Sequence, residues 1–224
     1  MSLKVAVIGA TRGCGYNFTS QAIEAGHQVS VLVRDPARLQ LSDQDKAKII
    51  IHKGDVCNYE DVRKLLKDQD VVVSSIGIRV DMKMIRDGTD VTICKDGTIS
   101  ILEALKSIYD DGLPVPRLIV VSSMGIGEHA KELPYLLWPF YHIVLHKPHI
   151  DKDRMEKAVI EASDWLKQWI LVRPALLTDG KHTGNYRVIE TANGYTISRA
   201  DVADFIIKNL TSKEWVQKGP VLAY

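Results

Sequence analysis

Three glycines lie close together where an apolar segment gives way to a helical pattern. The segment reads VAVI over residues 5–8, and the turn after it reads GATRGCG over residues 9–15. Glycine permits a tight turn and lets the backbone approach a pyrophosphate, whose charge is met by free amides and the positive end of the helix dipole. Because a strand, this turn, a helix and a second strand follow in order, a dinucleotide site explains the turn better than an ordinary loop does. The residues predicted to bind the phosphates are Gly9, Thr11, Arg12, Gly13, Cys14 and Gly15.

Short apolar runs alternate with helical patterns along the rest of the chain. The runs predict strands at 3–8, 29–33, 48–52, 70–75, 118–121 and 169–172, and a last edge strand at 220–223. The helical patterns predict helices from the glycine turn to Gly26 and at 59–67, 99–108, 151–162 and 199–210. We therefore expect an α/β fold with a doubly wound, mainly parallel Rossmann sheet of six or seven strands and helices on both faces.

Length and composition limit the classes of function. The 224 residues suffice for a single domain, 1–224, with a small substrate region formed by about 124–150 and 174–198. A formal net charge of +1 shows no bias towards nucleic acid. Cys14, Cys57 and Cys94 lack CxxC spacing, so they predict neither a zinc cluster nor a disulfide framework, and they indicate an intracellular, cytoplasmic chain.

The most apolar later stretch, residues 133–145, is shorter than the ~20 residues that span a bilayer and contains two prolines. The first residues lack the charged, apolar and small-residue zones of a signal peptide. We therefore expect neither a signal peptide nor a membrane-spanning segment. The aromatic side chains of the stretch predict a wall or lid for an apolar or aromatic small-molecule substrate, with core packing or a dimer surface as the alternatives. A monomer and a homodimer fit the sequence equally.

Several runs resemble the short-chain dehydrogenase/reductase superfamily, whose glycine motif GxxxGxG is matched by Gly9, Gly13 and Gly15. The runs VAVIGATRG, VSVLVRD, KGDV and ILVRPALLTDG are most similar to the atypical branch, which includes the NmrA-like and the biliverdin/flavin reductase-like proteins. The sequence departs from that pattern at Arg12, where many atypical members carry glycine. The resemblance covers nearly the whole chain and implies an NAD(P)-binding Rossmann protein.

The choice of cofactor depends on the end of the second strand, where an acidic residue would accept hydrogen bonds from the ribose 2′-hydroxyl. Arg34 occupies the first position after that strand, and its guanidinium can pair with a 2′-phosphate, with Arg12 beside the same group. These two arginines favour NADP(H). Asp35 follows immediately and keeps NAD(H) open as the alternative.

The resemblance implies further cofactor contacts at the carboxyl ends of later strands. Asp55 and Val56 are expected beside the adenine, although Asp55 has the alternative role of capping the helix that begins near Tyr59. The remaining residues expected at the ribose, pyrophosphate and nicotinamide are Ser75, Ile76, Gly77, Ser122, Lys152 and Pro174.

Catalytic groups are expected after the fifth strand. Ser123 can donate a hydrogen bond to an oxygen that gains charge as hydride arrives. The YxxxK pair of the superfamily's dehydrogenases is missing. His149 is the first candidate for a replacement acid, and Tyr141 and Asp151 are the next candidates. Lys152 is expected to hold the nicotinamide ribose, the alternative being an exposed ion pair with Glu156.

A metal site is not expected at the histidines of this region. His142, His146 and His149 lack a carboxylate in HExxH spacing, and Pro148 interrupts the segment.

Two functions fit these residues. One is an NADPH-dependent reductase that transfers hydride to a small carbonyl, quinone, flavin or similar conjugated acceptor, and a strong acceptor would explain the missing tyrosine. The other is an NmrA-like NADP-binding sensor or a non-redox enzyme of the isomerase type that retains the cofactor. An open pocket lined by Ser123 and His149 would favour the reductase.

Overall fold

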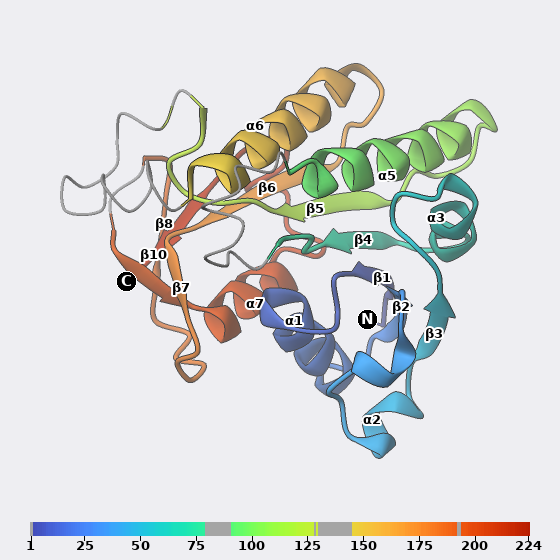
Figure 1. The fold of residues 1–224 in the computed structure, drawn as a ribbon, viewed down its shortest axis with the longest axis horizontal. Coiled ribbons are helices and arrows are strands. Elements are labelled where there is room, and N and C mark those ends of the chain that lie inside the picture. The colour runs from blue at the N-terminus through green and yellow to red at the C-terminus, as the bar shows by residue number, and fades with distance from the viewer. Residues whose placement is uncertain (1, 79–90, 128, 130–144, 192–193) are drawn as a thin grey trace.

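The computed structural model describes residues 2–78, 91–127, 129, 145–191 and 194–224. Within these ranges, eight strands form one sheet in the order β3-β2-β1-β4-β5-β6-β10-β8. Neighbouring strands are parallel except for β8, which pairs antiparallel with β10. Figure 1 shows α3, α5 and α6 on one face of the sheet and α1 and α7 on the other. The predicted fold class is therefore confirmed.

The strands of the sheet are β1 (Lys4–Ile8), β2 (Gln28–Val33), β3 (Ile50–Lys53), β4 (Val71–Ser74), β5 (Arg117–Val121), β6 (Trp169–Pro174), β8 (Arg187–Ile189) and β10 (Val221–Ala223). A separate parallel pair consists of β7 (Leu176–Thr178) and β9 (Thr196–Ser198). The α-helices are α1 (Gly13–Glu24), α2 (Asp43–Lys46), α3 (Tyr59–Leu66), α5 (Ile93–Asp110), α6 (His146–Glu161) and α7 (Arg199–Lys208). Two short 3-10 helices, η1 (Pro36–Arg38) and η5 (Ala162–Asp164), complete the described elements.

Both faces of the central strands are buried, which explains their unbroken apolar sequences. In β1, Val5 and Val7 belong to the core shared with α1 and α7, whereas Ala6 and Ile8 belong to the core shared with α3, α5 and α6. Successive side chains of a strand point to opposite faces, so one strand supplies both cores. The glycine turn therefore leaves from a strand, β1, that is packed between the two cores.

The fold differs from the expected one in its strand number, in the starts of two helices and at Pro148. It has eight strands among the described residues, not six or seven, because β8 lies outside β10; residues 220–223 are therefore not the edge. Helix α5 begins at Ile93 and α6 at His146, both earlier than expected. Pro148 does not interrupt α6, because it falls in the first turn, where a missing N–H leaves no helical hydrogen bond unmade.

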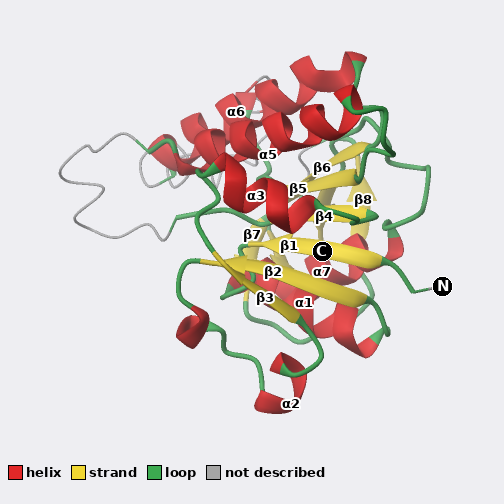
Figure 2. Ribbon diagram, turned by 90° about the vertical axis from the view of Figure 1, so that its right-hand side faces the viewer, coloured by secondary structure: helices red, strands yellow, loops and turns green. Residues whose placement is uncertain are grey.

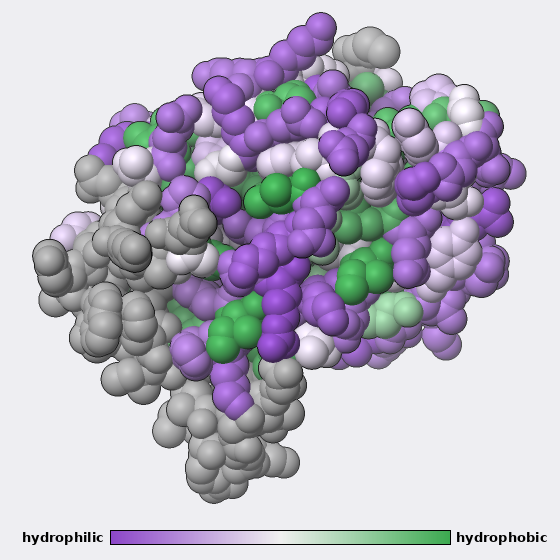
Figure 3. All heavy atoms as spheres, turned by 90° about the horizontal axis from the view of Figure 1, so that it is seen from above, coloured by the Kyte–Doolittle hydropathy of each residue, from purple (hydrophilic) through white to green (hydrophobic). Residues whose placement is uncertain are grey.

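The outer surfaces of the helices are mostly hydrophilic. Figure 3 shows the molecule from above the view of Figure 1, with hydrophilic side chains over most of the described surface and apolar groups between them. Figure 2 shows α3, α5 and α6 together on one side of the strands. None of the helices in the described part of the chain is both long and apolar enough to cross a membrane.

A buried ion pair joins α6 to β6. The Arg173 guanidinium donates to both carboxylate oxygens of Glu156, with Nη2 at 2.7 Å from Oε2 and Nε at 3.1 Å from Oε1. Arg173 Nη1 also donates to the Gly219 carbonyl at 3.3 Å, so the charge has partners on two sides. Removing one member of such a pair leaves the other charge buried without compensation.

We predict that Glu156→Ala lowers the free energy of unfolding by about 3–5 kcal/mol, measured by urea denaturation. The matched control is Asp110→Ala, which removes a carboxylate from the exposed ion pair with Lys106 on α5 and should cost less than about 1 kcal/mol. Equal losses for the two variants would contradict the assignment of a stabilising buried pair.

Candidate functional site

The glycine turn is pressed against the backbone that follows β4. A Cβ on Gly9 would lie 2.4 Å from the Ser75 carbonyl oxygen, and a Cβ on Gly15 would lie 2.3 Å from the Gly9 carbonyl oxygen. Gly9 and Gly13 adopt φ values of 90° and 64°, in the left-handed region. Larger residues at positions 9 and 15 would push the turn away from the sheet, so these two glycines set its position.

Helix α1 begins at Gly13, within this turn, and its first residues line a pocket at the carboxyl ends of the strands. Arg12 is the N-cap residue, and neither a side-chain cap nor an acidic residue occurs in the first turn. The first amides of a helix have no partner within the helix, and they carry the positive end of its dipole. This end of α1 is therefore suited to binding an anion.

Two pockets adjoin at the glycine turn and together form one groove along the carboxyl ends of the strands. Both are lined by Arg12 and by residues 75–77. The first pocket extends towards the ends of β2 and β3, and the second extends towards the ends of β5 and β6 and the start of α6. The strand order reverses between β1 and β4, which is where open α/β sheets bind their ligands.

The predicted cofactor residues divide between these pockets. The first is lined by Gly9, Thr11, Arg12, Arg34, Asp55, Val56, Ser75, Ile76 and Gly77. The second is lined by Arg12, Gly13, Cys14, Ser75, Ile76, Gly77, Ser122, Ser123, His149, Lys152 and Pro174. Gly15 lines neither pocket, since it packs against Gly9.

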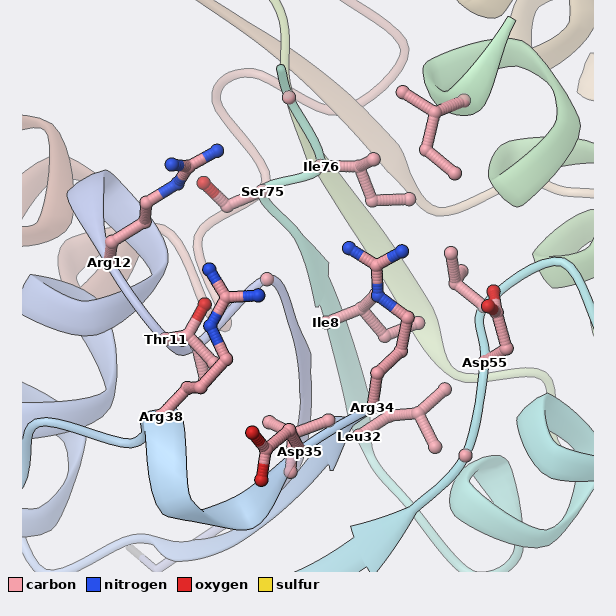
Figure 4. A pocket seen from close by; sticks show the side chains of 17 residues that line it. Ile8, Thr11, Arg12, Leu32, Arg34, Asp35, Arg38, Asp55, Ser75 and Ile76 are labelled. Carbon is pink, nitrogen blue, oxygen red and sulfur yellow. The ribbon is translucent and has the colours of Figure 1, made fainter. Parts of the chain in front are cut away.

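Three arginines line the first pocket, one more than the sequence indicated. Arg38 joins Arg12 and Arg34, and Figure 4 shows their guanidinium groups around the same space. Among the described residues, none of the three forms an ion pair or a side-chain hydrogen bond. Against the two carboxylates of Asp35 and Asp55, the three guanidinium groups leave the lining of this pocket with a net positive charge. Sequence reasoning missed Arg38 because its place beside Arg34 depends on the short helix η1, which gave no pattern in the sequence.

The carboxylates of the first pocket are engaged with their own backbone. Asp35 Oδ1 accepts from the Ala37 amide at 3.1 Å and caps η1. Asp55 Oδ1 accepts from the Cys57 amide at 3.0 Å. Asn58, not Asp55, caps α3, so the capping role considered for Asp55 is wrong.

The second pocket brings a hydroxyl and an imidazole together. Ser123, after β5, and His149, in the first turn of α6, approach to 3.2 Å between Oγ and Nε2. Ser122 is buried, and its Oγ has no hydrogen-bond partner among the described residues. Tyr141 and His142, also considered for this region, lie outside the described residues.

Lys152 points into the second pocket and does not pair along its own helix. Its Nζ donates to the Val121 carbonyl at 2.8 Å, at the end of β5. Glu156 is held by Arg173, so the exposed Lys152–Glu156 ion pair considered from the sequence is wrong. The Lys152 ammonium therefore stays at the carboxyl end of β5.

Asp151 is not available as an acid. It is fully buried, and its carboxylate accepts from the amides of Cys94 at 2.8 Å and Lys95 at 2.9 Å, at the amino end of α5. Its role is to cap that helix from outside.

Cys14 is also buried, and burial raises the pKa of its thiol to about 12, although the charges of Arg199 and Lys152 oppose the shift. The Cys14 thiol therefore stays protonated.

The second pocket has a volume of about 600 Å³, within the range of small-molecule sites. Apolar side chains of Leu145, Leu176 and Leu177 line it together with the polar groups described above. Two charged residues that the sequence did not single out, Asp179 and Arg199, also line it. Arg199 follows β9, and nothing in the sequence around it indicated that β9 ends at this groove.

Comparisons with known proteins identify a matching family and two similar fungal proteins. A family model described as NAD(P)H-binding matches residues 9–213. The chain is 31% identical to Reductase pytE of Aspergillus terreus, over 98% of this chain and 97% of that protein. It is 28% identical to Oxidase pynE of Aspergillus niger, over 97% of each.

Solved structures of two bacterial proteins are similar in fold. ChuY, an anaerobillin reductase from Escherichia coli O157:H7, has a TM-score of 0.76 at 18% identity, covering 98% of this chain and 96% of that one. A short-chain dehydrogenase/reductase from Veillonella parvula DSM 2008 has a TM-score of 0.73 at 15% identity, covering 100% and 94%. At these identities the likeness concerns the fold.

We predict that Gly15→Ala lowers the melting temperature markedly, because the new Cβ would meet the Gly9 carbonyl oxygen at 2.3 Å. Gly77→Ala is the matched control, since nothing lies within 4 Å of its Cβ position. Differential scanning calorimetry of both variants makes the comparison. A melting temperature for Gly15→Ala equal to that of the control would contradict the close packing of the turn.

Proposed function

Because the chain belongs to the NAD(P)H-binding family, we propose that it is an NADP(H)-dependent reductase. It would transfer hydride to a small carbonyl, quinone, flavin or similarly conjugated acceptor. The observation that carries the proposal is one groove with three arginines at one end, unpaired among the described residues, and the Ser123–His149 pair at the other. The reductase and oxidase names of the two fungal relatives support redox chemistry.

The residues of the groove fit a dinucleotide. Any side chain larger than hydrogen at position 9 would collide with Ser75, so glycine keeps the turn close to the sheet. The free amides at the amino end of α1, which begins in this turn, are suited to binding a pyrophosphate. The buried Ser122 hydroxyl, unpartnered among the described residues, supplies a donor or acceptor to a ligand in the second pocket. The cofactor, when bound, supplies the hydride.

The preference for NADP(H) rests on Arg34 and Arg38. Both guanidiniums line the first pocket, where a 2′-phosphate would lie, and arginine binds phosphate in a bidentate manner. Asp35 is the residue that would favour the 2′-hydroxyl of NAD(H), but its carboxylate is directed to the Ala37 amide. Net positive charge at this end therefore favours the phosphorylated cofactor.

The chain's own residues provide a proton path at the other end of the groove. His149 is the proposed acid, and its hydrogen bond with Ser123 places both groups where they can donate to an acceptor oxygen that gains negative charge. Lys152, fixed by the Val121 carbonyl, would hold the ribose next to the nicotinamide. Positioning by these groups replaces the tyrosine–lysine pair that the chain lacks.

The acceptor would be small and apolar or aromatic. Leucines from the two segments proposed as the substrate region, 124–150 and 174–198, line the second pocket. A cavity of about 600 Å³ has room for a nicotinamide ring and a small acceptor side by side. This open pocket favours the reductase over a cofactor-binding sensor, whose corresponding space would be filled.

We predict that Arg34→Ala and Arg38→Ala each weaken NADPH binding on the order of tenfold and change NADH binding by less than about twofold. The reason is that each variant removes a charge-assisted contact to a group that only NADPH carries. Isothermal titration calorimetry measures both constants. Lys213→Ala, which removes an exposed charge that lines neither pocket, is the control for net charge. Equal losses for NADPH and NADH would refute the assignment of the 2′-phosphate.

We predict that His149→Gln lowers kcat on the order of a hundredfold or more while the Kd for NADPH stays within about twofold. Glutamine keeps a hydrogen-bonding side chain of similar reach but cannot deliver a proton as imidazole does. Stopped-flow absorbance with a quinone acceptor separates turnover from binding. Unchanged kcat in this variant would exclude His149 as the acid.

A further inference from the structure

Arg199 and Asp179 leave the small parallel sheet side by side. The last paired residues of β7 and β9 are Thr178 and Ser198, and because the strands are parallel, the next residue of each emerges at the same end. There the Arg199 Nη1 donates to Asp179 Oδ1 at 2.6 Å. Both residues line the second pocket.

The backbone around this ion pair is firmly anchored. Ser198 caps α7 by accepting from the Asp201 amide at 2.9 Å. The buried Asp201 carboxylate accepts from the amides of Thr183 and Gly184, at 2.8 Å each, and from the Tyr224 hydroxyl at 2.6 Å. Burial would raise the pKa of Asp201, but these hydrogen bonds hold that pKa well below its usual range. The start of α7 is thus fixed, and the Arg199 side chain projects from a rigid base.

The ion pair itself is weakly held at its acidic end. The Asp179 side chain is 91% exposed and the Arg199 side chain is 28% exposed. Exposed ion pairs contribute little to stability, because water and salt screen the charges. Asp179 can therefore be displaced from Arg199 by a stronger anion at small cost.

The Arg199 side chain lies beside the amino end of α1. A Cβ on Gly13 would have Arg199 Nε as its nearest neighbour, at 3.9 Å. Figure 1 shows α7 next to α1, and Gln21 Nε2 donates to the Ala200 carbonyl at 2.9 Å, which ties the two helices together. The first turn of α1 contains no acidic residue, so the guanidinium and the helix dipole add to one positive field.

We propose that Arg199 binds the cofactor's pyrophosphate, and that Asp179 occupies the same guanidinium when the cofactor is absent. On binding, Arg199 exchanges an exposed carboxylate for a phosphate held between its side chain and the amides of α1. This inference rests on the proposed function, because it names a further residue of the same nucleotide site. Asp179 is then a competitor of the cofactor, and its charge lowers the affinity.

The test is calorimetric titration of the full chain with NADPH and, separately, NADH. Arg199→Ala should weaken both by the same factor, on the order of tenfold, because both cofactors carry the pyrophosphate. Asp179→Asn should tighten both, by about two- to fivefold, since the competing charge is gone. Lys213→Ala is again the control for lost positive charge, and thermal unfolding of each variant checks that the fold is kept.

The outcomes separate this inference from the proposed function. If Arg199→Ala weakened the binding of NADPH but not of NADH, Arg199 would contact the 2′-phosphate instead of the pyrophosphate, and the inference would be overturned. Unchanged cofactor binding with a raised KM for the acceptor would assign Arg199 to an anionic group of the substrate, which also overturns it. Unchanged or weaker binding in Asp179→Asn would refute the competition. If neither cofactor bound the unaltered chain, the proposed function itself would fail.

Discussion

The close approach of the glycine turn to the backbone after β4 is the constraint on which the groove depends. A Cβ at Gly9 or Gly15 would stand within 2.4 Å of a backbone oxygen, so the turn can lie at this depth only with glycine at both positions. That depth brings the amino end of α1 to the reversal point of the sheet, between the ends of β1 and β4. The two pockets meet there because residues 75–77 border both of them.

Charge is distributed unevenly along the groove. At one end, Arg12, Arg34 and Arg38 lack partners among the described residues, while the nearby carboxylates of Asp35 and Asp55 accept from backbone amides. At the other end, Lys152 donates to the Val121 carbonyl, His149 shares a hydrogen bond with Ser123, and Arg199 is paired with Asp179. This contrast separates a region suited to binding phosphates from one suited to positioning reacting groups.

Much of the fold could be predicted from the sequence, because buried parallel strands need unbroken apolar runs and helices need periodic ones. The family resemblance is likewise confirmed by the NAD(P)H-binding match over residues 9–213. The early starts of α5 and α6 were missed since their first turns contain polar residues or Pro148. The strands β7, β8 and β9, three residues each, are too short to give a pattern.

The positions of site residues that directly follow strands could be predicted from the sequence. The contacts that side chains make with distant segments could not. The spacing left an ion pair of Lys152 with Glu156 open as the alternative to a role at the ribose. In the structure, Arg173 binds Glu156 inside the core, and Lys152 donates to the Val121 carbonyl. Arg199 reaches the groove only because β9 ends beside β7, a pairing that local sequence does not reveal.

Calorimetric titration of the unaltered chain with NADPH and with NADH, under identical salt and pH, tests directly whether the groove binds a nicotinamide dinucleotide. We expect both to bind at one site per chain and NADPH to bind more tightly, because the first pocket presents arginines to the 2′-phosphate. Failure of both to bind, or tighter binding of NADH, would contradict this expectation.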